Sequence, residues 1–260
     1  MSNLQGRVAV ITGGSGAIGL AVAKKLGSLG SHVILLGRSN DKLNEALSDI
    51  DSNVSKAYFE CDVSDEDSLK ETAEKIYGTH AYVDILVTCA AAPAAGGKFE
   101  ESTLDEWQSL LSTDLNGVYL SNRIFGKSMI SQGYGRIVNF TSFHNIATYP
   151  YRSGYNAAKS AVEGLSRALA VEWGHHGITV NTVAPGPILT PRTEFFLSQD
   201  EANLQGMLSR TPNARIGKLE DVSSTVAFLV SSEAQHINAQ QIIIDGGWTK
   251  NAWWGDHSDL

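Results

Sequence analysis

Short runs of β-branched and aliphatic residues alternate along the chain with longer stretches in which apolar residues recur at helical spacing. The short runs predict strands at residues 7–12, 32–36, 56–61, 84–88, 136–141, 178–183 and 240–244. The helical spacing predicts helices at residues 17–29, 41–50, 65–77, 104–132 and 153–173. Such alternation is typical of parallel sheets with helices on both faces. The pattern therefore predicts a doubly wound α/β fold of about seven parallel strands, with a ligand site at their carboxyl ends.

Two segments interrupt this alternation. Between Pro185 and Ile216 there is no strand pattern, only Pro- and Gly-marked loop around one expected helix near residues 194–208. We expect residues 187–215 of this stretch to form a substrate-loop insert, because long inserts are usually lids or binding loops. The second segment is a Trp-rich tail at residues 248–260. Without a repeat or a linker, the chain fits one catalytic domain, residues 1–260.

Composition and charge narrow the class of protein. The chain of 260 residues has a formal net charge of −8, which argues against a nucleic-acid partner. There is neither a signal-peptide pattern at the start nor an apolar run near the roughly 18 residues of a membrane helix. Cys61 and Cys89 form no CxxC motif, so we expect no metal site and no disulfide framework. These features predict a cytoplasmic protein without a membrane partner.

The glycine-rich sequence TGGSGAIG, residues 12–19, joins the first predicted strand to the first helix. It fits two registers: Gly14, Gly16 and Gly19 as GxGxxG, or a longer motif that opens at Thr12 and Gly13. In either register glycines let the backbone approach phosphate oxygens, and the helix N-terminus supplies free N–H groups. This context predicts a Rossmann-type dinucleotide site.

The end of the second predicted strand bears on the choice of cofactor. An acidic residue there would bind the ribose hydroxyls of NAD, but the sequence has Gly37 followed by Arg38 and Ser39. An arginine fork pairs well with the 2′-phosphate of NADP. We therefore expect NADP(H), with NAD(H) as the alternative.

Three side chains form a candidate catalytic group. Tyr155 and Lys159 are four residues apart and so lie on one face of the predicted helix. A lysine cation stabilises a nearby phenolate, which allows a tyrosine to exchange protons near neutral pH. Ser142 follows a predicted strand and could orient a carbonyl or alcohol oxygen.

With these residues the chain resembles the short-chain dehydrogenase/reductase family from residue 7 to residue 247. The resemblance implies that Tyr155 is the general acid/base, that Lys159 assists it and binds the nicotinamide ribose, and that Ser142 holds the substrate oxygen. It also implies a cofactor turn at residues 12–19, an adenine contact at 62–63, a nicotinamide-side loop at 185–190 and hydride transfer to or from the nicotinamide. The residues expected to hold the cofactor are Gly13, Ser15, Gly16, Ile18, Gly19, Arg38, Ser39, Asp62, Val63, Ala90, Tyr155, Lys159, Pro185, Gly186, Ile188 and Thr190.

The chain departs from the family pattern at three places. Thr88 to Ala91 read Thr-Cys-Ala-Ala where the family has Asn-Asn-Ala-Gly, so the asparagine side-chain bonds are lost. Asp114 stands where the family's fourth catalytic residue, an asparagine, is expected, and we assign that water-binding, proton-relay position to it. Asn116 lies about 200° further round the helix. At Ala17, which replaces a glycine of the longer register, we expect a backbone that accepts a Cβ, with Gly16 supplying any positive φ.

The expected substrate side is polar and partly cationic. His144, Arg152 and Arg192 are candidate substrate contacts beside Ser142 and Tyr155, and Arg152 could hold a carboxylate or phosphate in a bidentate pair, or equally an acidic neighbour. Residues 93–95 and the apolar residues of the insert also fall on this side. The small-molecule substrate is then a polar or anionic hydroxy or oxo compound, such as a sugar acid or polyol.

We therefore expect an oxidoreductase that interconverts an alcohol and a ketone or aldehyde. Alternatives are an NAD-dependent dehydrogenase, a 3-oxoacyl thioester reductase and, from another class, an inactive nucleotide-sensing protein. By resemblance the protein is a homotetramer or homodimer built from the long helices at residues 104–132 and 153–173.

Overall fold

The strands form one seven-stranded parallel sheet in the order β3-β2-β1-β4-β5-β6-β7. The computed structural model describes residues 3–92 and 96–252. The strands are β1 (Val8–Thr12), β2 (His32–Gly37), β3 (Lys56–Glu60), β4 (Ile85–Thr88), β5 (Gly135–Phe140), β6 (Ile178–Pro185) and β7 (Gln241–Ile244). β1, β4, β5 and β6 are buried along their whole length, as expected for strands covered on both faces. The predicted strand count and the parallel arrangement are confirmed.

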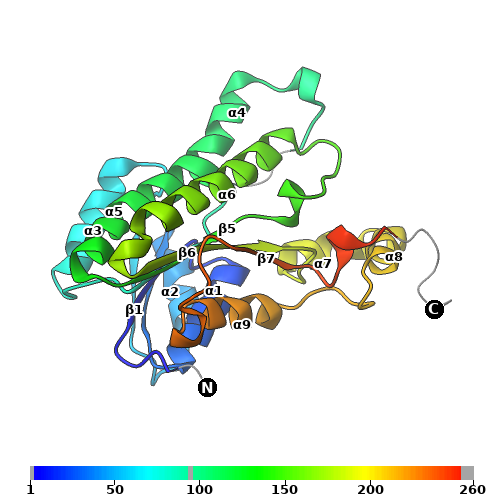
Figure 1. Ribbon diagram of the computed structural model, residues 1–260. Helices are drawn as coiled ribbons and strands as arrows, with labels where there is room; N and C mark the ends of the chain where they lie inside the picture. The colour runs from blue at the N-terminus through cyan, green and yellow to red at the C-terminus, as the bar shows by residue number, and fades with distance from the viewer. Residues whose placement is uncertain (1–2, 93–95, 253–260) are drawn as a thin grey trace.

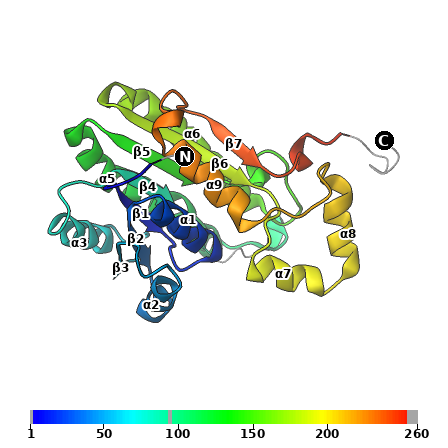
Figure 2. The same ribbon diagram turned by 90° about the horizontal axis from the view of Figure 1, so that it is seen from below.

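Helices cover both faces of this sheet, so the fold is the doubly wound one that the sequence predicts (Figure 1, Figure 2). One face carries α3 (Glu66–Tyr77), α4 (Leu104–Leu111), α5 (Gly117–Gln132) and α6 (Ser153–Trp173). The other carries α1 (Ala17–Ser28), α2 (Asn40–Ser48) and α9 (Leu219–Leu229). Each face has its own apolar core. The hydrophobic pattern did not predict α9, which buries Val222 and Val226 in the core on the side of the sheet that α1 covers.

The helix predicted over residues 104–132 is not one regular α-helix. It consists of α4, a π-helical turn η2 (Ser112–Asn116) and α5. Thr103 and Glu106 form a capping box that starts α4. Wide turns of this kind often occur at functional sites. Here the turn buries Asp114 completely and leaves Asn116 exposed, as the spacing of the two residues predicts.

The insert contains two helices where the sequence predicted one. α7 (Pro191–Ser198) and α8 (Glu201–Arg210) lie beyond β6 and near the carboxyl end of β7 (Figure 2). Asp200 separates them because its side chain accepts a hydrogen bond from the backbone N–H of Ala202 and so caps a new helix. The expected absence of a strand holds in this part of the structure, apart from an isolated bridge between Ile188 and Gly217.

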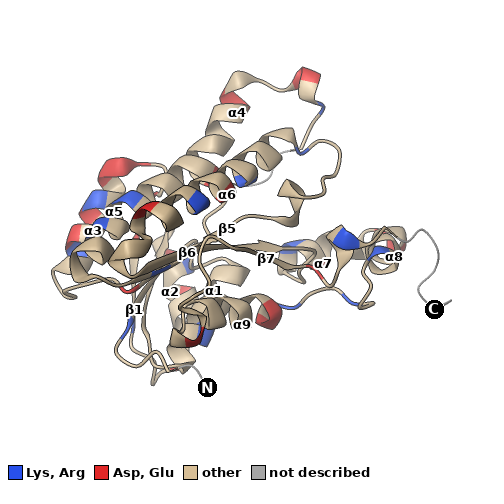
Figure 3. Ribbon diagram, viewed as in Figure 1, with Lys and Arg blue, Asp and Glu red and all other residues tan. Residues whose placement is uncertain are grey.

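Charged residues of both signs are interspersed over the outer helices. Acidic and basic positions of α3 lie beside basic positions of α5 (Figure 3), and Arg123 of α5 forms an ion pair with Glu66 of α3. Within residues 3–92 and 96–252, no helix combines the length and the apolar character needed to cross a membrane.

Candidate active site

Ser142, Tyr155 and Lys159 line one cavity of about 480 Å³ at the carboxyl ends of β5 and β6. Tyr155 and Lys159 project from one face of α6, and the lysine Nζ lies 5.6 Å from the centre of the tyrosine ring. Ser142 follows β5 and is buried, and its Oγ accepts a hydrogen bond of 3.3 Å from the backbone N–H of His144. The hydroxyl hydrogen of Ser142 remains available to a ligand. A phenol beside a buried cation and a nearby hydroxyl can together exchange a proton with an alcohol or carbonyl oxygen.

The cavity also brings together most of the residues that the sequence assigned to the nicotinamide and substrate sides. These are Ile18, His144, Arg152, Pro185, Gly186, Ile188, Thr190 and Arg192. Pro185 is the last residue of β6 and Gly186 follows it, and the backbone N–H of Gly186 donates a hydrogen bond to the carbonyl of Ile244 on β7. Thr190 caps α7 by accepting a bond from the backbone N–H of Thr193. The ends of β6 and α7 therefore form one wall of the cavity.

Asp114 lies behind Lys159, outside the cavity lining. Its Oδ1 is 2.9 Å from Nζ of Lys159, and the two side chains are 0% and 3% exposed. Oδ2 accepts a hydrogen bond of 3.1 Å from the backbone N–H of Ala92, which follows β4. Oδ1 has no hydrogen bond of good geometry within the described chain, so its contact with Lys159 is an ion pair. The carboxylate thus occupies the predicted position but contacts the lysine directly.

His144 is a neutral imidazole in this site. Burial and the charge of Arg152 lower the pKa of His144 to about 4. Its ring packs edge-on against Tyr155 and Tyr149 at 5.7 and 5.0 Å. The buried Nδ1 has no hydrogen-bond partner among the described residues. A neutral ring that lines the cavity agrees with a contact role rather than that of a charged acid.

An aromatic cluster lies beside the cavity and includes Phe143 and Tyr149 of its lining. Trp248 is 4% exposed and packs edge-on against Phe143 and Tyr149 at 5.2 and 5.6 Å. The guanidinium of Arg210 on α8 lies 4.5 Å from the Trp248 ring centre. The sequence marked the tail that begins at Trp248 as unusual but gave no sign of these contacts, which join elements far apart in the chain. Trp253 and Trp254 lie outside the described residues.

The insert contributes Thr193, Phe196 and Met207 to the cavity. Its other apolar residues have separate roles: Leu197 is buried and Phe195 is 69% exposed. The sequence predicted a helix in this insert but could not determine which of its residues face the site. The expected substrate-side residues 93–95 lie outside the described chain.

The glycine turn adopts the longer of the two registers. Gly13 has φ of +65°, and its carbonyl accepts the backbone N–H of Gly16 at 3.0 Å. Gly14 faces the core, where a Cβ would lie 2.7 Å from Cβ of Leu35. The expectation that Gly16 supplies the positive φ is wrong, because Gly16 caps α1 in an extended conformation with φ of −78°. Ala17 begins α1 with helical geometry, which a Cβ accepts.

The start of α1 is suited to bind a phosphate. Gly16 provides no side-chain cap, and the first turn of α1 holds no acidic residue. Its N–H groups and the helix dipole are therefore available to an anion. Gly19 lies against the turn, since a Cβ there would be 2.4 Å from the Gly13 carbonyl oxygen. Ser15 lies beside the end of β2, 3.5 Å from the position of a Cβ on Gly37.

The predicted adenosine side gathers at the ends of β2 and β3. Arg38 is exposed and follows Gly37 directly. Burial raises the pKa of Asp62, but hydrogen bonds from the Ser64 side chain and backbone and the charge of Arg38 together lower it. Ser39 caps α2, its Oγ accepting from the backbone N–H of Lys42 at 3.4 Å. The end of β2 therefore carries the cation Arg38 where an NAD site would carry an acidic residue.

Val63, which the resemblance places at the adenine contact, is part of the apolar core. The Thr-Cys-Ala-Ala segment, which departs from the family pattern, makes contacts of its own. Thr88 donates to Oδ1 of buried Asn139 at 2.9 Å. Burial raises the pKa of the Cys89 thiol more than the charge of Lys159 lowers it, so this cavity-lining side chain stays protonated. The backbone N–H of Ala90 donates to Oγ1 of Thr12 at 3.3 Å and joins β4 to the glycine turn.

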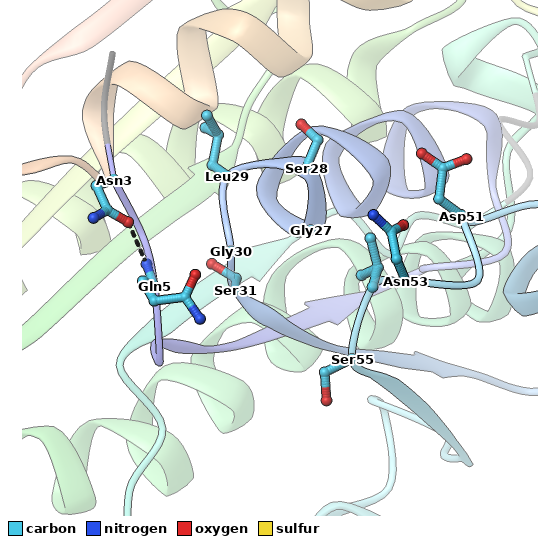
Figure 4. Close-up of a pocket in the computed structure, with 11 residues that line it drawn as sticks. Asn3, Gln5, Gly27, Ser28, Leu29, Gly30, Ser31, Asp51, Asn53 and Ser55 are labelled. Carbon is cyan, nitrogen blue, oxygen red and sulfur yellow. Dashed lines mark hydrogen bonds between the residues drawn. The ribbon is translucent and has the colours of Figure 1, made fainter.

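A second hollow of about 600 Å³ lies near the C-terminal end of α1 and the amino end of β2 (Figure 4). None of its described lining residues lines the cavity that contains Tyr155. Asp51 is the hollow's one ionisable side chain among the described lining residues, and the others are amides, hydroxyls, glycines and two aliphatic residues. No group of three or more potential metal ligands occurs within the part of the chain that the structure describes.

Comparison with known proteins agrees with this geometry. A family model described as enoyl-(acyl carrier protein) reductase matches residues 13–249. The gluconate 5-dehydrogenase of Gluconobacter oxydans (strain 621H) is 34% identical over 250 residues, covering 95% of this chain and 96% of that protein. The 3-oxoacyl-(acyl-carrier-protein) reductase of Haemophilus influenzae is 34% identical over 244 residues, covering 94% and 98%. The crystal structure of a gluconate 5-dehydrogenase from Burkholderia cenocepacia J2315 with NADP and tartrate has a TM-score of 0.90 at 27% identity, covering 96% and 98%.

The parallel sheet, the glycine turn and the Ser-Tyr-Lys cavity define a dinucleotide-dependent oxidoreductase acting on CH–OH groups. The chain belongs to the short-chain dehydrogenase/reductase family.

Proposed function

We propose that the protein is an NADP(H)-dependent oxidoreductase that interconverts a polar or anionic alcohol with its ketone or aldehyde. The observation that carries this proposal is the composition of the cavity. Arg152 and Arg192 line the same 480 Å³ space as Tyr155 and Lys159. Guanidinium groups pair well with carboxylates, so a hydroxy or oxo acid, a sugar acid or a polyol is the expected substrate class.

The residues around the glycine turn fit NADP(H). The uncapped start of α1 and the positive φ of Gly13 suit the pyrophosphate, and exposed Arg38 suits the 2′-phosphate. Asp62 and Ala90 fall on the adenosine side, and Ile18, Ile188 and Lys159 on the nicotinamide side. When bound, the nicotinamide accepts or supplies the hydride.

The proposed mechanism assigns one task to each catalytic side chain. Ser142 donates a hydrogen bond to the reacting oxygen of the substrate. Tyr155 takes a proton from that oxygen in alcohol oxidation and returns it in carbonyl reduction. The buried Lys159 cation favours the phenolate form of Tyr155 through its positive charge. The neutral ring of His144 and the guanidinium of Arg152 hold the remainder of the substrate.

The named relatives support this substrate class. Gluconate is a hydroxy acid, and tartrate, bound in the Burkholderia cenocepacia structure, is a hydroxy diacid. A 3-oxoacyl thioester reductase remains the second candidate because the Haemophilus influenzae relative carries that activity in its name. The net charge of −8 opposes an acidic carrier protein as substrate.

A screen with purified protein tests the proposal. Sugar acids, polyols, simple secondary alcohols and 3-oxoacyl thioesters are offered with NADP(H) and with NAD(H), and the change in reduced cofactor is followed. Turnover of hydroxy or oxo acids with NADP(H) is expected. A preference for apolar alcohols or thioesters would contradict the substrate class, and no turnover with bound NADPH would favour a nucleotide-sensing protein.

Arg152 allows a sharper test of the anion contact. Arg152→Gln should raise KM for a carboxylate substrate at least about tenfold, as expected for loss of a charged hydrogen bond. Arg167→Gln removes the same charge from α6, the helix that Arg152 precedes, at a side chain that is 61% exposed and paired with Glu163. An equal effect of both variants would show that the cavity arginine does not contact the substrate.

The proposed assembly is a homodimer or homotetramer in the cytoplasm. Exposed apolar side chains on α4, α5 and α6 support an interface there: Leu104 is 68%, Tyr119 45% and Val171 80% exposed. Light scattering of the purified protein measures the assembly, and a monomer at micromolar concentration would contradict it.

A further inference from the structure

The ion pair between Asp114 and Lys159 is more than an alternative way to hold the lysine. A neutral amide at this position would leave the lysine as a full positive charge inside the protein. The carboxylate instead places a negative charge 2.9 Å from Nζ, with both side chains shielded from solvent. The rest of the site therefore experiences the weaker field of an ion pair instead of the field of a single positive charge.

The fold holds Asp114 in this place from both sides. The π-helical turn η2 directs the side chain inward, and the backbone N–H of Ala92 donates to Oδ2 at 3.1 Å. This second contact leaves Oδ1 directed at Nζ. A rotation of the side chain away from Lys159 would break the Ala92 bond and leave two buried polar groups without partners, which is costly.

We propose that Asp114 is a positioning residue that fixes Lys159 and partly cancels its charge, and that it thereby moves the proton exchange of Tyr155 to higher pH. The inference rests on the proposed function of Tyr155 as the acid/base. Nζ of Lys159 lies 5.6 Å from the Tyr155 ring centre. A carboxylate on the other side of Nζ opposes the lysine's attraction for a phenolate, and at these distances in a buried site the opposition is substantial.

The other ionisable groups around Tyr155 do not restore the positive charge of Lys159 that Asp114 cancels. His144, whose ring packs edge-on against Tyr155, is neutral above about pH 4 because of its lowered pKa. Cys89 stays a thiol because burial raises its pKa. Arg152 and Arg192 line the same cavity and would share their charge with an anionic substrate. Lys159 and Asp114 therefore dominate the field behind the phenol.

The consequence for the reaction follows from its proton balance. In oxidation the alcohol loses a hydride to the nicotinamide and its hydroxyl proton to the Tyr155 phenolate, giving the carbonyl compound and the neutral phenol. This direction needs phenolate and so rises with pH. In reduction the phenol gives the same proton back, so that direction falls at high pH. A weaker positive field at Tyr155 shifts the rise of oxidation and the fall of reduction toward alkaline pH.

The test replaces Asp114 by asparagine. In Asp114→Asn the midpoint of the rising limb for oxidation should fall by roughly one pH unit, because Lys159 then acts uncompensated. A second readout needs neither substrate nor cofactor: the ultraviolet absorbance of the Tyr155 phenolate, taken as the difference from Tyr155→Phe in the same background. Its midpoint should fall by a similar amount.

Asp84→Asn is the matched control. Asp84 is 7% exposed, lies 2.7 Å from a nitrogen of Arg7, and accepts a bond of 2.9 Å from the backbone N–H of Val8. It makes contacts similar to those of Asp114, but just before the amino end of β4 and therefore at the opposite end of the strands. This variant should lose stability without moving the phenolate midpoint, which separates a field at Tyr155 from general loosening of the fold.

Each outcome decides one of the two proposals. An unchanged phenolate midpoint in folded Asp114→Asn overturns the charge compensation, whether or not the protein is active. A shifted midpoint, together with no turnover by the wild-type protein in the substrate screen, supports the compensation and rejects the proposed function. Asp114→Ser, which leaves room for water beside Lys159, serves if the asparagine variant does not fold. If both variants fail to fold, the pair is needed for the structure itself, and the assignment to proton exchange is rejected.

Discussion

Gly13 of the cofactor turn is in direct backbone contact with Ala90 after β4. A Cβ on Gly13 would lie 2.8 Å from both Cα and N of Ala90, and the φ of Gly13 is +65°. Gly13→Ala therefore combines a strained backbone with a steric clash. We expect it to lower the free energy of unfolding by about 2–4 kcal/mol and to weaken NADPH binding. Chemical denaturation with and without NADPH measures both effects.

Gly133→Ala separates the two causes. Gly133 ends α5 with φ of +72°, but nothing lies within 4 Å of a Cβ placed there. This control should show only the backbone term, about 1 kcal/mol, and unchanged cofactor binding. Equal losses in the two variants would mean that the contact between Gly13 and Ala90 relaxes at little cost.

Arg38 is expected to determine the preference for NADP(H). Arg38→Ser removes the exposed guanidinium at the end of β2 and should weaken NADPH binding about 10- to 100-fold, with little change for NADH. Fluorescence titration with both cofactors measures this difference. Lys127→Ser removes one positive charge from the exposed surface of α5 and controls for a general electrostatic effect. Weaker binding of both cofactors to Arg38→Ser would contradict the 2′-phosphate contact.

Much of this architecture was predictable from local sequence. The apolar runs located the seven strands, and the four-residue spacing of Tyr155 and Lys159 placed both on one face of α6. The resemblance to a family supplied the proximity of Ser142, which comes from another element. These features follow from short-range periodicity or from a known motif.

Other features depend on contacts that periodicity does not contain. The π-helical turn that buries Asp114 replaces part of an otherwise regular helical pattern, and its partner Ala92 follows a different strand. The break between α7 and α8 is caused by the cap at Asp200. Gly16 was expected to carry the positive φ because it lies at the tip of the turn. Gly16 instead adopts the extended conformation that caps α1, and Gly13 has the positive φ.

Tyr155→Phe tests the acid/base assignment. Loss of the phenolic proton should lower kcat by about 10²- to 10⁴-fold, while NADPH binding changes little because the ring remains. Steady-state kinetics and cofactor titration are the two measurements. Tyr149→Phe removes a second hydroxyl from the same cavity and is expected to lose much less activity. Comparable losses in both variants would indicate that the cavity, and not Tyr155 specifically, determines the rate.

His144 predicts a dependence of stability on pH. Its pKa is lowered from 6.5 to about 4 by burial and by Arg152, so the native ring stays neutral between these values while the unfolded chain takes up a proton. Protonation then favours the unfolded state, and the free energy of unfolding falls as the pH drops from about 6.5 to 4. After allowance for solvent screening of a ring that is not fully buried, this contribution is roughly 1–2 kcal/mol. His144→Gln should lose that part of the pH dependence.

Urea denaturation at pH 7 and at pH 4.5 gives the loss of unfolding free energy over this interval. The effect of His144 is the difference between the losses of the wild type and of His144→Gln. The wild-type protein should lose more stability over this interval than His144→Gln, whereas His175→Gln, at an exposed position after α6, should follow the wild type. Other groups titrate in the same range, but they contribute equally to the wild type and to both variants and so cancel. An identical pH dependence in His144→Gln and the wild type would mean that the ring takes up its proton equally well in the native state, and the neutral imidazole assigned to the substrate contact would be wrong.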